Sequence, residues 1–383
     1  MKKGWEIKTL NQISENLDSK RVPITKNIRS NGTIPYYGAS GIVDYVEEFI
    51  FDEDLLLVSE DGANLLARTY PIAFSICGKT WVNNHAHVLK FKTKTTQKFV
   101  ELYLNFIKLD DFVSGMAQPK LNQSMLNKIP IPLPPLHEQQ RIVSILDEAF
   151  AAIAKAKANA EQNLKNAKEL FESYLQGLFE KKGKGWEEKK VNQIGIAQTG
   201  TTPKTVEKEN YGDFIPFIKP ADVDFYGVGD IRYDNEGLSE IGLKKGRKME
   251  PGSILMVCIG ATIGKVGFAE QVVSCNQQIN SLTVKKEFEP KFIYYAMTSR
   301  AFQDKVLLEG KGAQATLPII NKTKWENLTI SFPKSKNEQK LFIEKLDALQ
   351  NETKKLESIY QKKIADLEEL KKSILQKAFS GEL

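Results

Sequence analysis

The stretch "PPLHEQQRIVSILDEAF", residues 134–150, decides the fold, because the chain repeats its pattern. Nearly the same order returns in "FPKSKNEQKLFIEKLDALQ", residues 332–350. In each copy a strand-like run ends in proline, and a His-Glu-Gln or Asn-Glu-Gln tripeptide then opens a long helical pattern. Each pattern predicts a helix of about 40 residues, which would be roughly 60 Å long at 1.5 Å per residue.

The repeat extends to the parts of the chain that precede these helices. "GWEIKTLNQI" from Gly4 returns as "GWEEKKVNQI" from Gly185, and "IPYY" from Ile34 returns as "IPFI" at the same offset. "WVNNHAHVLKFK" from Trp81 corresponds to "SCNQQINSLTVK" from Ser274. Between these anchors the two halves differ freely. A shared frame therefore carries two distinct variable surfaces.

Apolar residues in both helical stretches recur at alternating steps of four and three, which is a 3.5-residue repeat typical of a coiled-coil seam. The simplest arrangement pairs the two helices with each other, antiparallel, so that the halves are related by a pseudo-twofold axis. Two long amphipathic helices in an ordinary bundle are the alternative. The predicted seam consists of Ile142, Leu146, Ile153, Ala160 and Leu170 in the first helix and Phe342, Leu346, Leu349, Leu356, Leu367 and Leu370 in the second.

The fold class we predict is α+β. Short strand-like runs bounded by Gly, Pro and Asn predict two mixed α/β domains in tandem, at residues 1–136 and 184–335. The helices at residues 137–183 and 336–383 would separate these domains and form the antiparallel coiled coil.

Composition limits the class of protein further. The chain of 383 residues is 41% hydrophobic and 27% charged, and its net charge of +6 permits a polyanionic partner without requiring one. We find no run of apolar residues long enough for a membrane span and no signal peptide behind the N-terminal lysines. Three cysteines without CxxC spacing suit a reducing compartment. We therefore expect a cytoplasmic protein.

The predicted loops of both domains are rich in side chains that bind phosphate or base edges. Lys and Arg supply salt-dependent affinity for the DNA backbone, while Asn, Gln and Arg can make bidentate contacts with bases. The candidates in the first domain are Lys20, Arg21, Lys26, Arg29, Asn31, Arg68, Lys79, Asn83, Asn84, His85, Gln118 and Lys120. Those in the second are Lys204, Lys219, Arg232, Lys244, Lys245, Arg247, Lys248, Lys265, Gln277, Gln278 and Gln314. Taken singly, each is more often a solvated surface residue, and only their accumulation on the loops of both domains is informative.

Catalytic motifs are not evident. "IGATIGKVG" from Ile259 lacks the spacing of a phosphate-binding loop. Cys77, His85 and His87 could offer three zinc ligands, with both histidines on one face of a strand, but no fourth ligand is evident. A hydrogen-bonding role suits the two histidines better. We see no nuclease carboxylate pair, no Ser-His-Asp arrangement and no cofactor-binding glycine loop. We therefore expect no catalytic residue, metal or cofactor, and a chain that is not itself an enzyme.

Several motifs together resemble one family over essentially the whole chain. They include "SEDGANLLAR" from Ser59, "GKTWVNNHAHVL" from Gly78, "IGATIGKVGFA" from Ile259 and the terminal "LKKSILQKAFSGEL" from Leu370. In order and in duplicate, these motifs resemble the specificity (S) subunit, HsdS, of type I restriction-modification systems. The second copy departs from the pattern where "FPKSKNEQ" lacks the double proline.

The resemblance implies a function in a complex. Each globular half would be a target recognition domain that reads one half of a bipartite, asymmetric site in double-stranded DNA. The helices would set the spacer and dock two copies of the modification subunit, which methylates adenine with S-adenosylmethionine, and a restriction subunit would cleave the DNA. A coiled-coil scaffold with two interaction domains that bind no DNA is the alternative, and an enzyme such as a methyltransferase or nuclease is the remaining rival. The base sequence and spacer length cannot be read from the chain.

Overall fold

The computed structural model describes residues 4–29, 31–115, 118–183, 185–224, 230–310 and 318–383. It divides into two compact units, of which unit 1 holds Met1–Asn159 with Lys363–Leu383 and unit 2 holds Ala160–Lys362. Two helices of 45 residues each, α5 (Leu136–Glu180) and α11 (Lys336–Ser380), contribute to both units. No helix within the described ranges combines the length and the apolar character needed to span a membrane.

Unit 1 contains a small antiparallel sheet, a small mixed sheet and a strand pair. One sheet has the order β2-β9-β6-β7, the other has the order β4-β3-β8-β5, and β1 pairs with β10. The strands are β1 (Glu6–Thr9), β2 (Ser14–Asn16), β3 (Ile34–Gly38), β4 (Gly41–Val46), β5 (Phe51–Asp52), β6 (Leu55–Ser59), β7 (Ala73–Ile76), β8 (Lys79–Val82), β9 (Ala86–Phe91) and β10 (Pro130–Leu133). The short helices are α1 (Leu10–Ile13), α2 (Asn64–Ala67) and α4 (Gln123–Lys128), with η1 (Asp18–Lys20) and the longer α3 (Lys94–Phe106).

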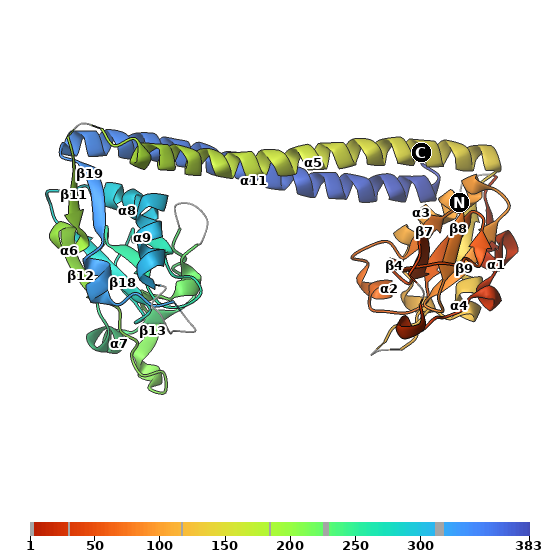
Figure 1. Ribbon diagram of the computed structural model, residues 1–383, viewed down its shortest axis with the longest axis horizontal. Helices are drawn as coiled ribbons and strands as arrows, with labels where there is room; N and C mark the ends of the chain where they lie inside the picture. Colours follow the sequence, from red (N-terminus) through yellow and green to blue (C-terminus); the bar gives the residue numbers. More distant parts are fainter. Residues whose placement is uncertain (1–3, 30, 116–117, 184, 225–229, 311–317) are drawn as a thin grey trace. The chain divides into compact units, whose positions relative to one another are not determined.

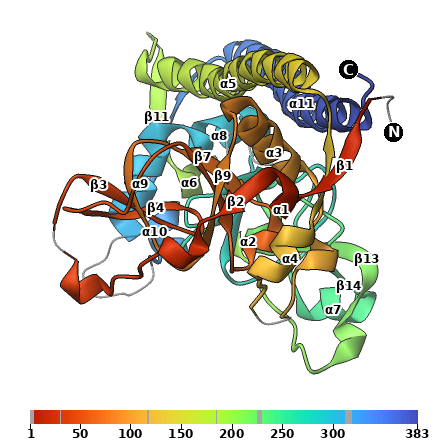
Figure 2. The same cartoon turned by 90° about the vertical axis from the view of Figure 1, so that its right-hand side faces the viewer.

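The core of unit 1 lies between its first sheet, α3 and the two long helices. Every residue of β6 is buried, as its unbroken apolar sequence "LLLV" requires of a central strand. Figure 2 shows α3 below α5 and α11. The ring of Phe379, near the end of α11, lies 5.4 Å from Phe99, 5.1 Å from Tyr103 and 5.4 Å from Phe106 between ring centroids. The last turns of α11 therefore complete the core of unit 1.

Unit 2 repeats this plan with different side chains. Its sheets have the orders β12-β18-β15-β16 and β14-β13-β17, and β11 pairs with β19. The strands are β11 (Trp186–Lys190), β12 (Gly195–Thr199), β13 (Tyr211–Ile218), β14 (Gly237–Leu238), β15 (Ile254–Val257), β16 (Val266–Phe268), β17 (Ser274–Cys275), β18 (Ile279–Val284) and β19 (Thr329–Pro333). The shorter helices are α6 (Val191–Ile194), α7 (Glu240–Lys245), α8 (Pro290–Thr298), α9 (Arg300–Gly310) and α10 (Lys322–Glu326). In Figure 1, α8 lies between the long helices and the sheet, as α3 does in unit 1.

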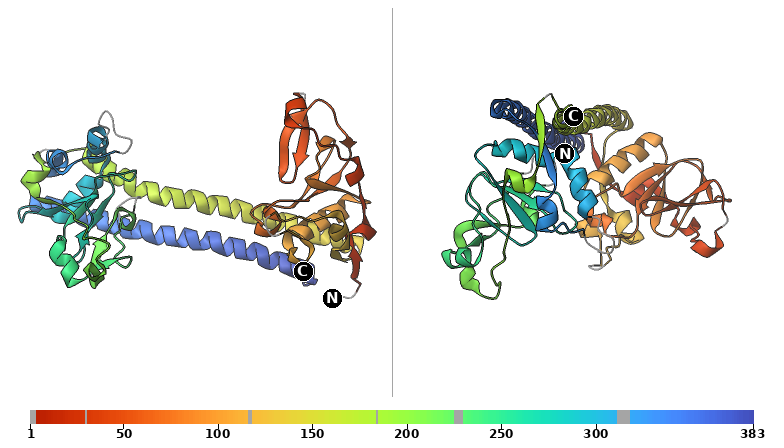
Figure 3. Two further views of the ribbon diagram at one scale, coloured as in Figure 1. Left: turned by 90° about the horizontal axis from the view of Figure 1, so that it is seen from below. Right: turned by 60° about the vertical axis from the view of Figure 1, so that its left-hand side comes forward.

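The long helices pair antiparallel within each unit. In unit 1, Arg141 donates to the carbonyl oxygen of Leu383 at 2.5 Å, and Lys157 pairs with Glu368 at 2.6 Å. Residue numbers thus rise along α5 while those of the contacting residues fall, as antiparallel pairing requires. In unit 2, the Trp186 ring packs on Phe179 of α5 and on Phe342 of α11. Figure 3 shows the two helices side by side. The predicted α+β class with an antiparallel coiled coil is confirmed.

Most members of the predicted seam are buried or partly buried, and the last member in each helix is exposed. Among its members, Ile142, Leu146, Ile153, Ala160 and Leu346 are buried, and Phe342, Leu349, Leu356 and Leu367 are partly buried. Leu170 and Leu370, by contrast, are 51% and 47% exposed. A helix with 3.6 residues per turn drifts away from a strict 3.5-residue repeat, so the buried face advances along the helix. Phe171 replaces Leu170 and packs on Tyr295 of α8.

Candidate nucleic-acid interface

Three segments of unit 1 meet where β6 and β8 end. They are residues 60–62, the turn at residues 83–85 and residues 118–121, and we call them the loop edge of unit 1. Backbone hydrogen bonds join them: the Glu60 amide donates to His85 at 2.9 Å, the Leu121 amide to Glu60 at 2.8 Å, and the Gly62 amide to Pro119 at 3.0 Å. Gly62 has a φ of +110°, a conformation that glycine adopts without strain.

Unit 2 has a loop edge of the same construction at residues 258–260, 276–278 and 318–320. Three backbone bonds again join the segments, from the amides of Cys258, Ile320 and Gly260 to the carbonyls of Gln278, Cys258 and Pro318 at 2.8, 2.9 and 3.0 Å. Gly260 repeats the positive φ, at +105°. Because these bonds use backbone groups alone, the frame holds while the side chains on it differ.

A tight turn projects from each loop edge, and both turns are built in the same way. Asn83 and Asn276 are each 7% exposed, and their side-chain oxygens accept from the amides of His85 at 2.8 Å and Gln278 at 3.1 Å. Each is an Asx turn, in which the buried Asn fixes the backbone two residues on. The residue at the apex, Asn84 in unit 1 and Gln277 in unit 2, is exposed.

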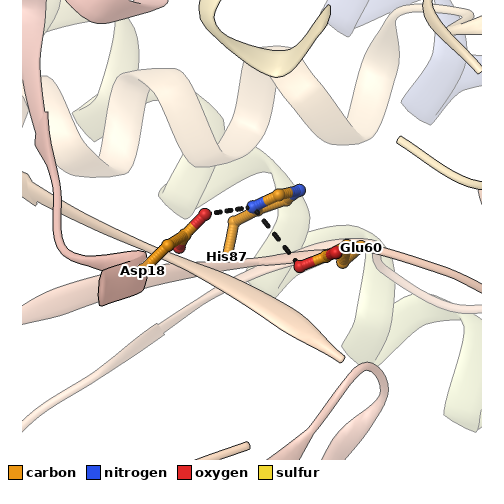
Figure 4. A group of neighbouring side chains, drawn as sticks. All are labelled: Asp18, Glu60 and His87. Carbon is orange, nitrogen blue, oxygen red and sulfur yellow. Dashed lines mark hydrogen bonds and ion pairs between the residues drawn. The ribbon is translucent and has the colours of Figure 1, made fainter. Parts of the chain in front are cut away.

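A network of polar side chains holds the loop edge of unit 1, and Figure 4 shows three of its members, Asp18, Glu60 and His87. His87 is buried; its Nε2 donates to the Leu121 carbonyl at 2.7 Å, and its Nδ1 lies 2.6 Å from a carboxylate oxygen of Asp18. Arg21 donates to Glu60 at 2.7 Å and to the Ala86 carbonyl at 2.8 Å. The network therefore ties η1 and β9 to two segments of the loop edge.

The same network sets the ionisation of its two acids. Burial alone would raise the pKa of Asp18, but hydrogen bonding and charge from His87, with Arg21, hold it below its usual range. Burial would also raise the pKa of Glu60. Hydrogen bonds and charge from Arg21, His87 and Lys120 outweigh burial and lower this pKa. Both carboxylates are therefore held ionised and paired.

The group Asp18, Glu60 and His87 also brings three possible metal-ligand atoms within 4.8 Å of one another. Arg21 and Lys120 already pair with the Glu60 carboxylate, at 2.7 and 3.2 Å, so a metal ion would have to displace them. We interpret the group as a structural network.

The two histidines do not share a face, contrary to the expectation from their spacing. His85 lies in the turn before β9 begins, and its Nδ1 is 2.8 Å from Asp61 at the surface. His87 lies in the strand and is buried. The alternation of a strand does not apply across its first residue.

Several predicted DNA-binding cations have partners inside their own unit. The most constrained is Arg68, which has a left-handed φ of 53° and donates to the carbonyls of Leu104 at 3.0 Å and Ile107 at 2.9 Å. It thereby caps the C-terminus of α3. Arg29 pairs with Asp44 at 2.9 Å and lies over the Tyr36 ring. These arginines support the fold.

The remaining candidates divide by their contacts. Those that contact a side chain or backbone oxygen of their own unit are Lys79, Lys120, Lys204, Lys219, Arg232, Lys245, Arg247, Lys248, Lys265, Gln277 and Gln278. The candidates whose exposed side chains make no hydrogen bond or ion pair with a described residue are Lys20, Lys26, Asn31, Asn84, Gln118 and Lys244. Gln314 lies outside the described residues. DNA contact by any of them stays a prediction.

With this duplicated frame in view, the comparisons with known proteins identify the class. The family model described as "Type I restriction modification DNA specificity domain" matches residues 2–165 and again residues 183–366. The chain therefore belongs to this family and carries its domain twice. The two matched ranges agree with the internal repeat of the sequence and with the presence of a loop edge in each unit.

Individual relatives carry the corresponding names. A putative type I restriction enzyme specificity subunit of Haemophilus influenzae, S.HindORF215P, is 39% identical over 146 residues, which is 38% of this chain and 37% of that protein. The MjaVIII specificity subunit of Methanocaldococcus jannaschii is 23% identical over 420 residues, covering 99% of this chain and 93% of that protein. The first match thus spans little more than a third of its relative, and the second nearly all of it.

The fold is also found among solved structures. A chain from a structure of complex assembly and conformational transition of the type I R-M system superposes with a TM-score of 0.75 at 19% identity, covering 100% of this chain and 99% of that one. At this identity the likeness concerns the fold.

Proposed function

We propose that this chain is the specificity subunit of a type I restriction-modification complex and recognises a bipartite, asymmetric site in double-stranded DNA. Residues 1–136 and 184–335 are then two target recognition domains, each reading one half-site through its loop edge. The observation that carries this proposal is the duplication: two matches to a DNA specificity family, on two copies of one backbone frame with different exposed side chains.

The helical segments, residues 137–183 and 336–383, set the spacer between the half-sites in this proposal. They are suited to it because each is a single helix of 45 residues, about 67 Å at 1.5 Å per residue. Half-sites one helical turn of DNA apart are about 34 Å apart. The helices also dock two copies of the modification subunit, which supplies the adenine methyl transfer, and the complex recruits a restriction subunit. The chain itself catalyses no step.

The test of DNA recognition is a salt-titrated binding assay on random duplexes with the modification subunit present. Enrichment of one bipartite motif supports the proposal. Binding with no sequence preference would contradict the recognition of a site. No binding even at low salt would favour the scaffold alternative, and cofactor binding by the chain alone would favour an enzyme.

The ruler is tested separately. Insertion of one helical turn after Ala156 should change the preferred spacer and leave both half-sites unchanged. The matched control exchanges residues 184–335 for the equivalent domain of a relative, and should change one half-site and leave the spacer. An unchanged spacer after the insertion contradicts the role of the helices.

A further inference from the structure

The two Asx turns of the loop edges are the same structural device with one changed residue. The strand before each turn pairs in parallel with an equivalent strand of its own unit. β8 pairs with β3 in unit 1 (Val82 with Tyr37), and β17 pairs with β13 in unit 2 (Cys275 with Ile218). The amide of the buried Asn then donates to the partner strand, at 3.0 Å from Asn83 and 3.1 Å from Asn276. Asn84 and Gln277 therefore occupy equivalent positions, which the sequence alignment of the two halves also gives.

The residue after each apex is held as firmly as the one before it. The carbonyl of His85 accepts from the Glu60 amide, and the carbonyl of Gln278 accepts from the Cys258 amide. Side chains add to this, because His85 lies against Asp61 and the Gln278 oxygen accepts from the Asn276 side-chain nitrogen at 3.0 Å. Each apex residue thus stands on a backbone fixed on both sides.

The apex side chains are both carboxamides, and both remain able to bind. Asn84 is exposed and makes no hydrogen bond with a described residue. Gln277 is exposed, and its side-chain oxygen accepts from the Thr202 hydroxyl. A carboxamide oxygen has two lone pairs, so this contact orients Gln277 and still leaves one acceptor site and both amide protons free.

A carboxamide on a fixed support has one matching partner among the base edges of the major groove. Its oxygen accepts from the N6 amine of adenine while its nitrogen donates to N7. Guanine, cytosine and thymine do not present this donor–acceptor pair. Pre-organisation strengthens the discrimination, because a side chain whose backbone is already fixed needs less ordering on binding.

We propose that Asn84 and Gln277 are equivalent specificity-determining residues, each reading one adenine in its own half-site. This inference rests on the proposed function and adds to it the residue and the base. It places the variable part of recognition at the apex and the constant part in the backbone frame beneath.

The test uses the full chain with its modification subunit and selects sequences from a random duplex library. Asn84→Ala should lower the preference for A·T at one position of one half-site by roughly 5- to 150-fold and leave the other half-site unchanged. Gln277→Ala should do the same in the other half-site. Asn11→Ala, which removes an exposed carboxamide of unit 1 outside the loop edge, is the matched control and should leave the motif as it is.

A second variant keeps the shape of the side chain and changes its hydrogen bonds. Asn84→Asp can only accept, so it cannot donate to adenine N7 but can accept from the cytosine N4 amine. The preferred base at that position should shift towards cytosine. Because the apex is exposed, the thermal unfolding midpoint of either Asn84 variant should match that of the wild type.

The outcomes separate the inference from the function. If the wild type selects a bipartite motif but the Asn84 and Gln277 variants select the same one, or bind all duplexes more weakly by an equal factor, the inference is overturned and the proposed function stands. If the wild type selects no motif, both are overturned.

Discussion

Removal of the Phe379 ring should destabilise unit 1 strongly, although this residue lies almost at the end of the sequence. Phe379 is 9% exposed and lies 5.1–5.4 Å from three aromatic rings of α3. Truncation of a buried Phe to Ala costs about 3–5 kcal/mol, since it removes apolar burial and leaves a cavity. We expect Phe379→Ala to cost unit 1 an amount in this range.

Hydrogen exchange measured by mass spectrometry is the appropriate assay, because a chain with two units need not unfold in one step. The amides of β6 and β9 in unit 1 should lose protection equivalent to about 3–5 kcal/mol. Leu370→Ala is the matched control on the same helix; Leu370 is 47% exposed, and its truncation should cost about 1 kcal/mol or less. Equal loss of protection in the two variants would refute the assignment of the last turns of α11 to the core of unit 1.

Three further predictions concern the loop edges. The pKa of Asp18 is lowered in the folded state, so the contribution of this carboxylate to stability is present above the ordinary carboxyl pKa of about 4 and is lost as the pH falls through the depressed value. Asp18→Asn should therefore lower the thermal unfolding midpoint at pH 7 and flatten the decline of this midpoint in acid. An unchanged dependence of the midpoint on acid pH would contradict the network. Lys20→Gln should reduce the slope of the logarithm of the DNA-binding constant against the logarithm of salt concentration by about 0.9, if the substitution removes one phosphate contact. The control Lys92→Gln, beyond the far end of β9, should leave the slope unchanged. Equal slopes for the two variants would show that Lys20 is ordinary surface charge. Thr202→Val should free Gln277 and reduce base preference in the second half-site alone, and a motif identical to the wild type in the selection assay would show that the hydroxyl orients nothing.

The architecture could be predicted from the sequence because the chain contains it twice. A repeat of proline stop, start signal and long helix gave the helices, and buried runs such as Leu55–Val58 gave the central strands. Leu170 and Leu370 are exposed in the structure, because a fixed 3.5-residue repeat ignores the rotation of the buried face where a helix packs on a globular core.

The partners of the candidate side chains could not be predicted from the sequence. Composition indicates cations on loops, yet Arg21 pairs with Glu60, 39 residues away along the chain, and Arg68 donates to Leu104, 36 residues away. No local pattern reveals such partners, so structural arginines and free lysines look alike in the sequence. The Asx turns were also missed, although Asn83 and Asn276 align in the two halves and such an alignment is the signal that could have found them.

The two loop edges show how one backbone frame can hold different side chains. Beneath the first, a buried His87 bonds the Leu121 carbonyl and an acid of η1; beneath the second, the aligned Asn280 bonds the Cys258 sulfur at 3.2 Å and the Thr199 hydroxyl at 2.8 Å. The supports differ in charge and size, yet the backbone bonds above them agree within 0.1 Å in length. A frame held by backbone amides is insensitive to the side chain at its apex. Exchange of Asn for Gln there lengthens the side chain by one methylene group without moving the turn. Under the proposed function, specificity can therefore change residue by residue, while the backbone bonds that fix each apex stay constant.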